Sequence, residues 1–210
     1  VQQWKPEYLS KSLHVFDVNP SYRLGIYPGR NNPEPVHAGK NPPKGPVVHF
    51  YVSGLKDSTA GSVSVYDKNR KLIKEYSTTS TEYKLEIDNG MNQFNWDLKY
   101  GNAEKADGMI LWSGVPSPLF AAPGTYYARV KVGTDSAEVP FTVLADPNYK
   151  ISQQDYEAQF EFLQQVQNKY NEVQVGVKDI RTLKGQISDF TARQGKDLPK
   201  DVKEKADTIV

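Results

Sequence analysis

Apolar and polar residues alternate along most of residues 46–146, as they do in strands that bury one face. These short alternating runs are separated by polar or glycine-containing turns. The predicted strands lie at 47–52, 62–66, 72–76, 82–87, 94–98, 126–132 and 139–143. About seven short strands at this spacing are typical of an immunoglobulin-like β-sandwich, so we expect that fold for residues 46–146.

Two glycine turns bracket the region with the clearest alternation. Gly90 precedes Phe94 and Trp96, which alternate with polar residues, and Gly124 precedes a second alternating run. Because residues two apart share a face of a strand, Phe94 and Trp96 should both point between the two sheets.

Residues 1–45 differ from the rest of the chain in being irregular and rich in Pro, Gly and Asn. Proline fixes φ and removes a backbone hydrogen-bond donor, so it disfavours both helices and central strands. Only 13–16 and 22–26 have the pattern of short strands. We therefore expect residues 1–45 to form an extended Pro/Gly-rich arm that lies over another part of the molecule.

A helical period begins after residue 147. Ser152 and Asp155 have the spacing of a capping box, which starts a helix. Apolar residues then recur in steps of three and four as far as Phe190, the pattern of a helix that pairs lengthwise with another. A second helix is predicted from about Pro199 to the last residue. For residues 150–210 we expect a long helix or a helical hairpin, truncated at its C-terminal end.

The apolar stripe of the long helix is longer than the second helix can cover. The residues expected at the helix interface are Val166, Tyr170, Val173, Val177, Ile180, Leu183, Ile187 and Phe190. Large exposed apolar patches usually mark interfaces. The sandwich, sequence outside this chain or a second copy could cover the stripe, and we expect the chain to self-associate through it.

Composition narrows the classes of partner. The formal net charge of +1 lacks the basic excess of a nucleic-acid-binding protein, so we expect no nucleic-acid partner. No stretch approaches the roughly 20 apolar residues of a membrane helix, so we expect no membrane insertion.

The absence of Cys excludes disulfides and thiolate metal sites. Val1, in place of an initiator Met, points to a mature product or a fragment.

Residue types that carry chemistry are scattered along the chain. His14, His37 and His49 lack the spacing of metal ligands or of a catalytic base with its partners. Asp97 is expected to make a turn or cross-strand hydrogen bond, and Asp146, which stands before a proline, to accept a hydrogen bond in a turn. A glycosidase needs two carboxylates facing each other across a cleft, and the sequence has no nucleophile elbow, Walker loop or zinc-protease motif. We expect no catalytic residue, metal or cofactor, and hence no enzyme activity.

The long connection between the Trp96 strand and the Tyr126 strand holds two further candidate sites. Asn102, Glu104 and Asp107 carry oxygen ligands for Ca²⁺, but their spacing matches no EF-hand, which favours a solvated loop. A candidate ligand or docking surface consists of Tyr100, Trp112 and Phe120. Exposed aromatic rings on a sandwich can stack sugars. Docking to a neighbouring domain or closure of the core is the alternative that we favour.

Four segments of the chain resemble successive motifs of one protein family. Residues 38–48 (AGKNPPKGPVV), 90–98 (GMNQFNWDL), 107–112 (DGMILW) and 122–126 (APGTY) follow the same order. With the stretch 15–24 and the helix after residue 147, they resemble the C-terminal tail of bacterial sortilin-like proteins with BNR-type propeller repeats, often labelled glycosyl hydrolases.

The resemblance implies a non-catalytic Ig-like module with a helical extension, belonging to a secreted or cell-envelope protein. The hydrolase label belongs to the propeller, which precedes this tail in the family and has no counterpart in these residues. An extracytoplasmic location and partner domains within a larger parent protein are therefore expected. A carbohydrate-binding module, or an accessory part of a hydrolase whose active site lies elsewhere, is the alternative.

Overall fold

The computed structural model describes residues 3–24, 37, 39, 43–56, 59–110, 112, 114, 116–194 and 198–209. The chain divides into two compact units. We call the first, Val1–Gly101 with Leu119–Phe160, the β unit. The second, Asn102–Pro118 with Glu161–Val210, is the helix unit.

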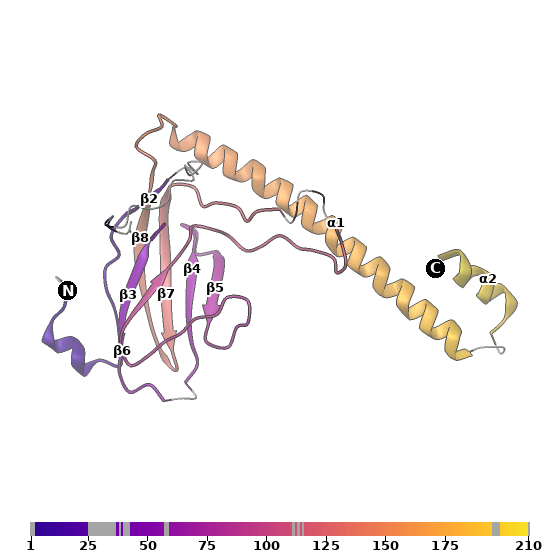
Figure 1. The fold of residues 1–210 in the computed structure, drawn as a ribbon, viewed down its shortest axis with the longest axis horizontal. Coiled ribbons are helices and arrows are strands. Elements are labelled where there is room, and N and C mark those ends of the chain that lie inside the picture. The colour runs from indigo at the N-terminus through magenta and orange to yellow at the C-terminus, as the bar shows by residue number, and fades with distance from the viewer. Residues whose placement is uncertain are drawn as a thin grey trace. The chain divides into compact units, whose positions relative to one another are not determined.

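Eight strands within the described residues form two sheets, so the fold is mainly β and sandwich-like, as predicted (Figure 1). The strands are β1 (Leu13–Val15), β2 (Ser21–Arg23), β3 (Val47–Val52), β4 (Gly61–Tyr66), β5 (Leu72–Ser77), β6 (Gly90–Asn95), β7 (Gly124–Val132) and β8 (Asp135–Ala145). The strand order is β1-β3-β6 in one sheet and β2-β8-β7-β4-β5 in the other. The strands pair antiparallel, except that β2 runs parallel to β8.

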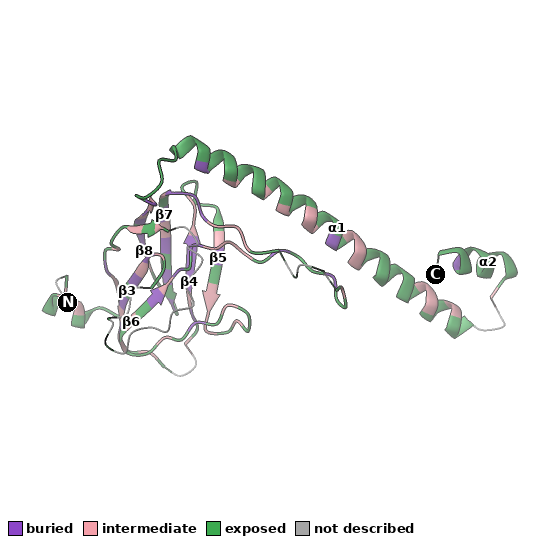
Figure 2. Cartoon of the chain, turned by 45° about the horizontal axis from the view of Figure 1, so that its top comes forward, coloured by how far each residue is buried: buried purple, intermediate pink, exposed green. Residues whose placement is uncertain are grey.

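Side chains from both sheets form one hydrophobic core. Figure 2 colours buried residues purple on strands of both sheets. Every second residue of β7 is buried, which reproduces the alternation in the sequence. Phe94 and Trp96 are buried as predicted, and Trp96 is fully enclosed, with 0% exposure. Trp96 directly follows β6, and its ring centroid lies 5.3 Å from that of Tyr126 and 5.9 Å from that of Phe141, both in strands of the other sheet. The core thus joins the two sheets through these rings.

Residues 82–87 do not form the strand that their alternation predicts. Leu85 is buried and Ile87 packs against the core, so the alternation does report burial. However, the backbone bonds back to the end of β5: Ser77 N donates to Tyr83 O, and Leu85 N donates to Ser77 O, each at 3.0 Å. The segment carries the chain from β5 in one sheet to β6 in the other, and a crossing segment cannot pair along its length.

The N-terminal segment supplies an edge strand to each sheet. β1 pairs with β3, and β2 pairs with β8, so both short runs that the sequence marked as strands enter the sheets. The 3-10 helix η1 (Pro6–Ser10) precedes them. Residues 25–36, 38 and 40–42 lie outside the described residues, and with them most of the predicted Pro-rich arm and the end of the 22–26 prediction.

An aromatic cluster lies where η1 meets β1. The Tyr8 ring stacks on His14 at a centroid distance of 3.7 Å and meets Phe16 edge-on at 5.7 Å. Trp4 contacts Tyr51 at 5.3 Å. Aromatic contacts of this kind add stability beyond the burial of their area, so they fix η1 on the three-stranded sheet.

We expect the β unit to lose stability in acid through His14. Burial, and then the nearby Lys11, lower the pKa of His14 from its ordinary value of 6.5. The folded state therefore binds this proton more weakly than the unfolded state does. The contribution of neutral His14 to the free energy of unfolding is fully present above about pH 6.5, and it is lost as the pH falls through the lower pKa of the folded state.

The melting temperature, measured between about pH 7.5 and pH 5 where histidine titrates, checks this expectation. His14→Phe keeps a ring against Tyr8 but cannot titrate, so the variant should lose less stability in acid than the parent protein. Equal losses in the two proteins would contradict the assignment to His14.

The edge strand β5 turns a lysine toward the core. Lys74 faces the buried Val65 across the ladder with β4, and it is 8% exposed. Its Nζ lies 4.6 Å from the Tyr83 ring centroid and 5.5 Å from that of Tyr76. Burial is the main influence on the pKa of Lys74 and lowers it, while Asp97 acts in the opposite direction. The aromatic faces accommodate the ammonium group.

The helical part is one long helix, α1 (Gln153–Gln194), followed by the short α2 (Lys200–Ile209). Of the two predicted alternatives, the structure thus shows a single long helix rather than a helical hairpin, and the short second helix begins where the sequence predicts it. α1 begins with the predicted capping box: Asp155 N donates to Ser152 Oγ at 3.1 Å, and that hydroxyl donates to the Asp155 carboxylate at 2.6 Å. Among the described helices, none has both the length and the apolar character needed to cross a bilayer.

Candidate interaction surface

The first two turns of α1 are anchored within the β unit. Gln153 Nε2 donates to the carbonyl of Pro123 at 2.8 Å, and Lys68 forms an ion pair with Glu157 at 3.2 Å. The Arg23 guanidinium of β2 lies 5.0 Å from the Tyr156 ring centroid, and its Nη2 donates to Gln159 at 3.4 Å. These contacts fix the start of the helix on β2 and on the connections at Lys68 and Pro123.

In the helix unit, a polar stripe of α1 holds the segment 102–107. The backbone N–H of Glu104 donates to Asn171 Oδ1 at 2.9 Å, and the N–H of Ala106 donates to Gln174 Oε1 at 3.0 Å. Gln174 is only 2% exposed. Residues 171 and 174 are about one helical turn apart in α1, and residues 104 and 106 are two residues apart in an extended segment. Alternate backbone amides of the segment 102–107 therefore meet successive turns of α1.

Two charged side chains extend this polar stripe. Lys178 Nζ donates to the Glu104 carboxylate at 2.6 Å, a hydrogen bond that raises the pKa of the lysine. Arg181 donates to the carbonyl of Asp107. We call Asn171, Gln174, Lys178 and Arg181 the clamp residues. They place Glu104, one of the three residues considered as Ca²⁺ ligands, in an ion pair, and no cluster of His, Asp and Glu suited to a metal ion occurs in the described residues.

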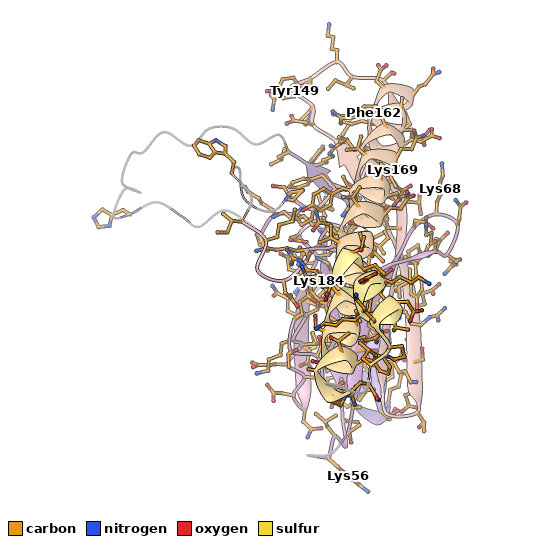
Figure 3. The ribbon with its side chains drawn as sticks, turned by 90° about the vertical axis from the view of Figure 1, so that its right-hand side faces the viewer. Lys56, Lys68, Tyr149, Phe162, Lys169 and Lys184 are labelled. Atoms are coloured by element: carbon orange, nitrogen blue, oxygen red, sulfur yellow. The ribbon has the colours of Figure 1, made fainter. Side chains whose placement is uncertain are left out.

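The predicted interface residues lie on another side of α1 and remain largely open to solvent. We define the apolar face by Phe162, Leu163, Val166, Tyr170, Val173, Val177, Ile180, Leu183, Ile187 and Phe190, which includes all eight predicted interface residues. Val173 is 55% exposed and Ile180 is 67% exposed, while Tyr170, Val177 and Ile187 are half-buried. Figure 3 marks Phe162 along this helix, together with Lys169 and Lys184. The expected partner of this face stays a prediction.

The three aromatic residues considered as a ligand surface divide between the two units. Tyr100 and Phe120 belong to the β unit, where both pack against the core and Tyr100 N donates to Leu119 O at 2.9 Å. The Tyr100 ring lies 4.8 Å from that of Phe160, and burial raises the pKa of its hydroxyl. Trp112 belongs to the helix unit and is fully exposed.

The other candidate residues occupy structural positions. Asp146 accepts a hydrogen bond from Asn148 N at 2.9 Å, the turn contact that the sequence predicts. Asp97 accepts one from Lys99 N at 3.1 Å, which is the turn contact of the two predicted alternatives. His37 and His49 are exposed. The chain thus uses these carboxylates to shape turns.

Sequence reasoning missed the clamp residues, because their stripe is polar and hydrophobic periodicity does not detect it. The available signal is the spacing of Gln164, Gln167, Asn171, Gln174, Lys178 and Arg181, which recur in steps of three and four. That period places hydrogen-bonding side chains on one side of a helix as reliably as it places apolar ones. A scan of the chain against models of known protein families gave no match, and neither did a search of curated proteins.

Proposed function

We propose that the chain is a non-catalytic structural and interaction module, in which the β unit is the scaffold and the apolar face of α1 binds a partner. The observation that carries this proposal is the exposure of the apolar face along a helix whose polar stripe is already occupied by the segment 102–107. Leaving such side chains in water is unfavourable by about 25 cal/mol per Å² of apolar area. Patches of this kind usually mark interfaces.

The finer part of the proposal is an immunoglobulin-like module of an exported, propeller-containing bacterial protein. Two of the motifs that resemble the sortilin-like tail, 90–98 and 122–126, contain β6 and the start of β7. These motifs supply Trp96 and Tyr126, which are in ring contact in the core. Other domains of the parent protein and a second copy of the chain are the partners that we propose for the apolar face.

A second candidate function is carbohydrate binding through the segment around Trp112. The full exposure of the Trp112 indole favours it, because an open aromatic face can stack on a sugar ring. Tyr100 and Phe120 support it less, since both pack against the β core. The interaction module remains our first proposal.

A glutamate in the apolar face should weaken self-association by at least about tenfold, or 1.4 kcal/mol, because a charge would enter the interface without a partner. Val173→Glu places the charge on the apolar face. Val175→Glu is the matched control, because Val175 is a 44% exposed valine of the same helix that points to the opposite side. Both sites are open, so neither variant should unfold the monomer.

Light scattering over a range of protein concentrations measures this difference. The parent chain and Val175→Glu should gain mass with concentration, whereas Val173→Glu should stay close to the monomer mass. If both variants behaved as the parent does, self-association would not use the apolar face.

A further inference from the structure

The apolar face of α1 has the repeat of an antiparallel helix pair. From Leu163 to Ile187, eight core positions follow one another in alternating steps of three and four, and Lys184 alone among them is not apolar. With the flanking Phe190, the repeat covers four heptads, enough to specify a coiled coil. This inference rests on the proposed function, since it concerns the same surface.

Lys184 disfavours a parallel pair in register. In that arrangement each core residue faces its own copy, so two Lys184 ammonium groups would meet inside an apolar layer, which is unfavourable. In an antiparallel pair centred on position 175, each core residue faces the core residue of the second copy that lies equally far on the other side of that position in the sequence. Lys184 then faces Val166 of the second copy, and the aliphatic part of its long side chain can lie along the apolar surface.

The other layers of the antiparallel register pair residues of compatible size. Leu163 faces Ile187 of the second copy, Tyr170 faces Ile180, and Val173 faces Val177. The repeat is therefore close to palindromic, which is what a two-fold symmetric interface requires, because each helix must present the same surface to its copy.

The position of Gly176 agrees with this register. A glycine within a helix destabilises it relative to alanine, and a Cβ built at Gly176 would meet nothing within 4 Å in its own chain. The monomer therefore gives no packing reason for this glycine. On this flank the nearest residues of the two copies pair about position 176, one residue from the centre of the core layers. Gly176 therefore lies beside Gly176 of the second copy near the two-fold axis, where the lack of a side chain lets two helices approach closely. By the same offset, Phe162 lies nearest to Phe190 of the second copy.

The other flank of the core positions, opposite the Gly176 flank, is occupied by the segment 102–107 of the same chain. Gln174 and Arg181 lie on that flank, and both donate or accept hydrogen bonds with the segment 102–107. A second helix can therefore cover the core positions and the Gly176 flank, but not the clamp residues.

The size of the apolar face suits a reversible dimer. From Phe162 to Phe190 the helix extends about 43 Å, at about 1.5 Å per residue, and a helix is about 10–12 Å wide. The face of each copy thus projects to an area on the order of 500 Å², or about 1,000 Å² for a pair, which is near the lower bound for a specific interface. We propose that two copies of the chain form a two-fold, antiparallel helix pair through α1, centred at Val175 and Gly176.

Cysteine cross-linking tests the orientation, because the native sequence contains no Cys. Leu163→Cys and Ile187→Cys are made as single variants, one of them carrying an affinity tag, and are oxidised separately and as a mixture. In the proposed pair the two cysteines face each other across the copies. Two Leu163→Cys sites lie about 36 Å apart, at about 1.5 Å for each of the 24 intervening steps. The mixture should form a covalent heterodimer, and neither variant should link to itself.

Asn168→Cys and Thr182→Cys form the matched control, because they are equally far from position 175 but lie on the outer side of the helix, and they should not link. Self-linking of Leu163→Cys would overturn the antiparallel orientation, and a dimeric mass without any link would overturn the register. In both cases the proposed function would stand. A monomeric mass at every concentration, unchanged in Val173→Glu, would overturn the pair and also self-association through the apolar face.

Discussion

Replacing Trp96 by Ala is expected to lower the free energy of unfolding by about 3–5 kcal/mol, the range for removing a large buried aromatic side chain. Trp96 is fully enclosed and contacts the rings of Tyr126 and Phe141. Its indole N–H also donates to the carbonyl of Lys99 at 3.0 Å, so truncation would leave a cavity and an unpaired acceptor. Because the net stability of a domain is only about 5–15 kcal/mol, this loss removes a large share of the stability of the β unit.

Denaturant unfolding followed by circular dichroism measures this loss. Trp112→Ala is the matched control, since it removes the same side chain from a fully exposed position and should change stability by less than about 0.5 kcal/mol. Equal midpoints for the two variants would show that Trp96 does not lie in the core.

Gly45→Ala should destabilise the β unit by about 2–4 kcal/mol, combining backbone strain with a steric clash. Gly45 has φ of +88°, a conformation that residues with a Cβ rarely adopt. A Cβ at this position would lie 2.1 Å from the carbonyl oxygen of Trp96. Relief of that contact requires movement of the backbone that carries the core tryptophan.

Gly54→Ala separates the strain from the clash. Gly54 also has a positive φ, +72°, but a Cβ there would meet nothing within 4 Å. This control should therefore lose only about 1–2 kcal/mol, the cost of the backbone conformation alone. A loss in Gly45→Ala no larger than that in Gly54→Ala would mean that the Trp96 carbonyl yields without cost.

The strands of the β unit could be predicted because burial of one face imposes alternation on the sequence. Alternation correctly predicted β3, β4, β5 and β7 and the burial of Phe94 and Trp96. It failed at residues 82–87, where Leu85 and Ile87 are directed toward the core but the backbone crosses between sheets. Alternation shows which side chains are inside, and it does not show where the backbone hydrogen bonds go.

The start and the length of α1 could also be predicted, because a capping box and a helical period are local signals. What the sequence did not reveal is the use of a polar side of the helix within the helix unit. There, Asn171 and Gln174 satisfy backbone amides of a segment about 70 residues earlier in the chain, a pairing that no local period encodes. For the same reason, proximity in sequence suggested one surface for Tyr100, Trp112 and Phe120, although they belong to different units.

The lysine in β5 has a consequence for how the molecule aggregates. An open sheet edge is a template on which strands of other molecules can polymerise, and an inward-pointing charge is one of the devices that prevent this. An added strand would cut off the remaining access of the Lys74 ammonium group to water, so growth of the sheet at β5 would bury a cation more deeply. This edge therefore disfavours fibril-like stacking of sheets and leaves the helix pairing that we propose as the contact between copies.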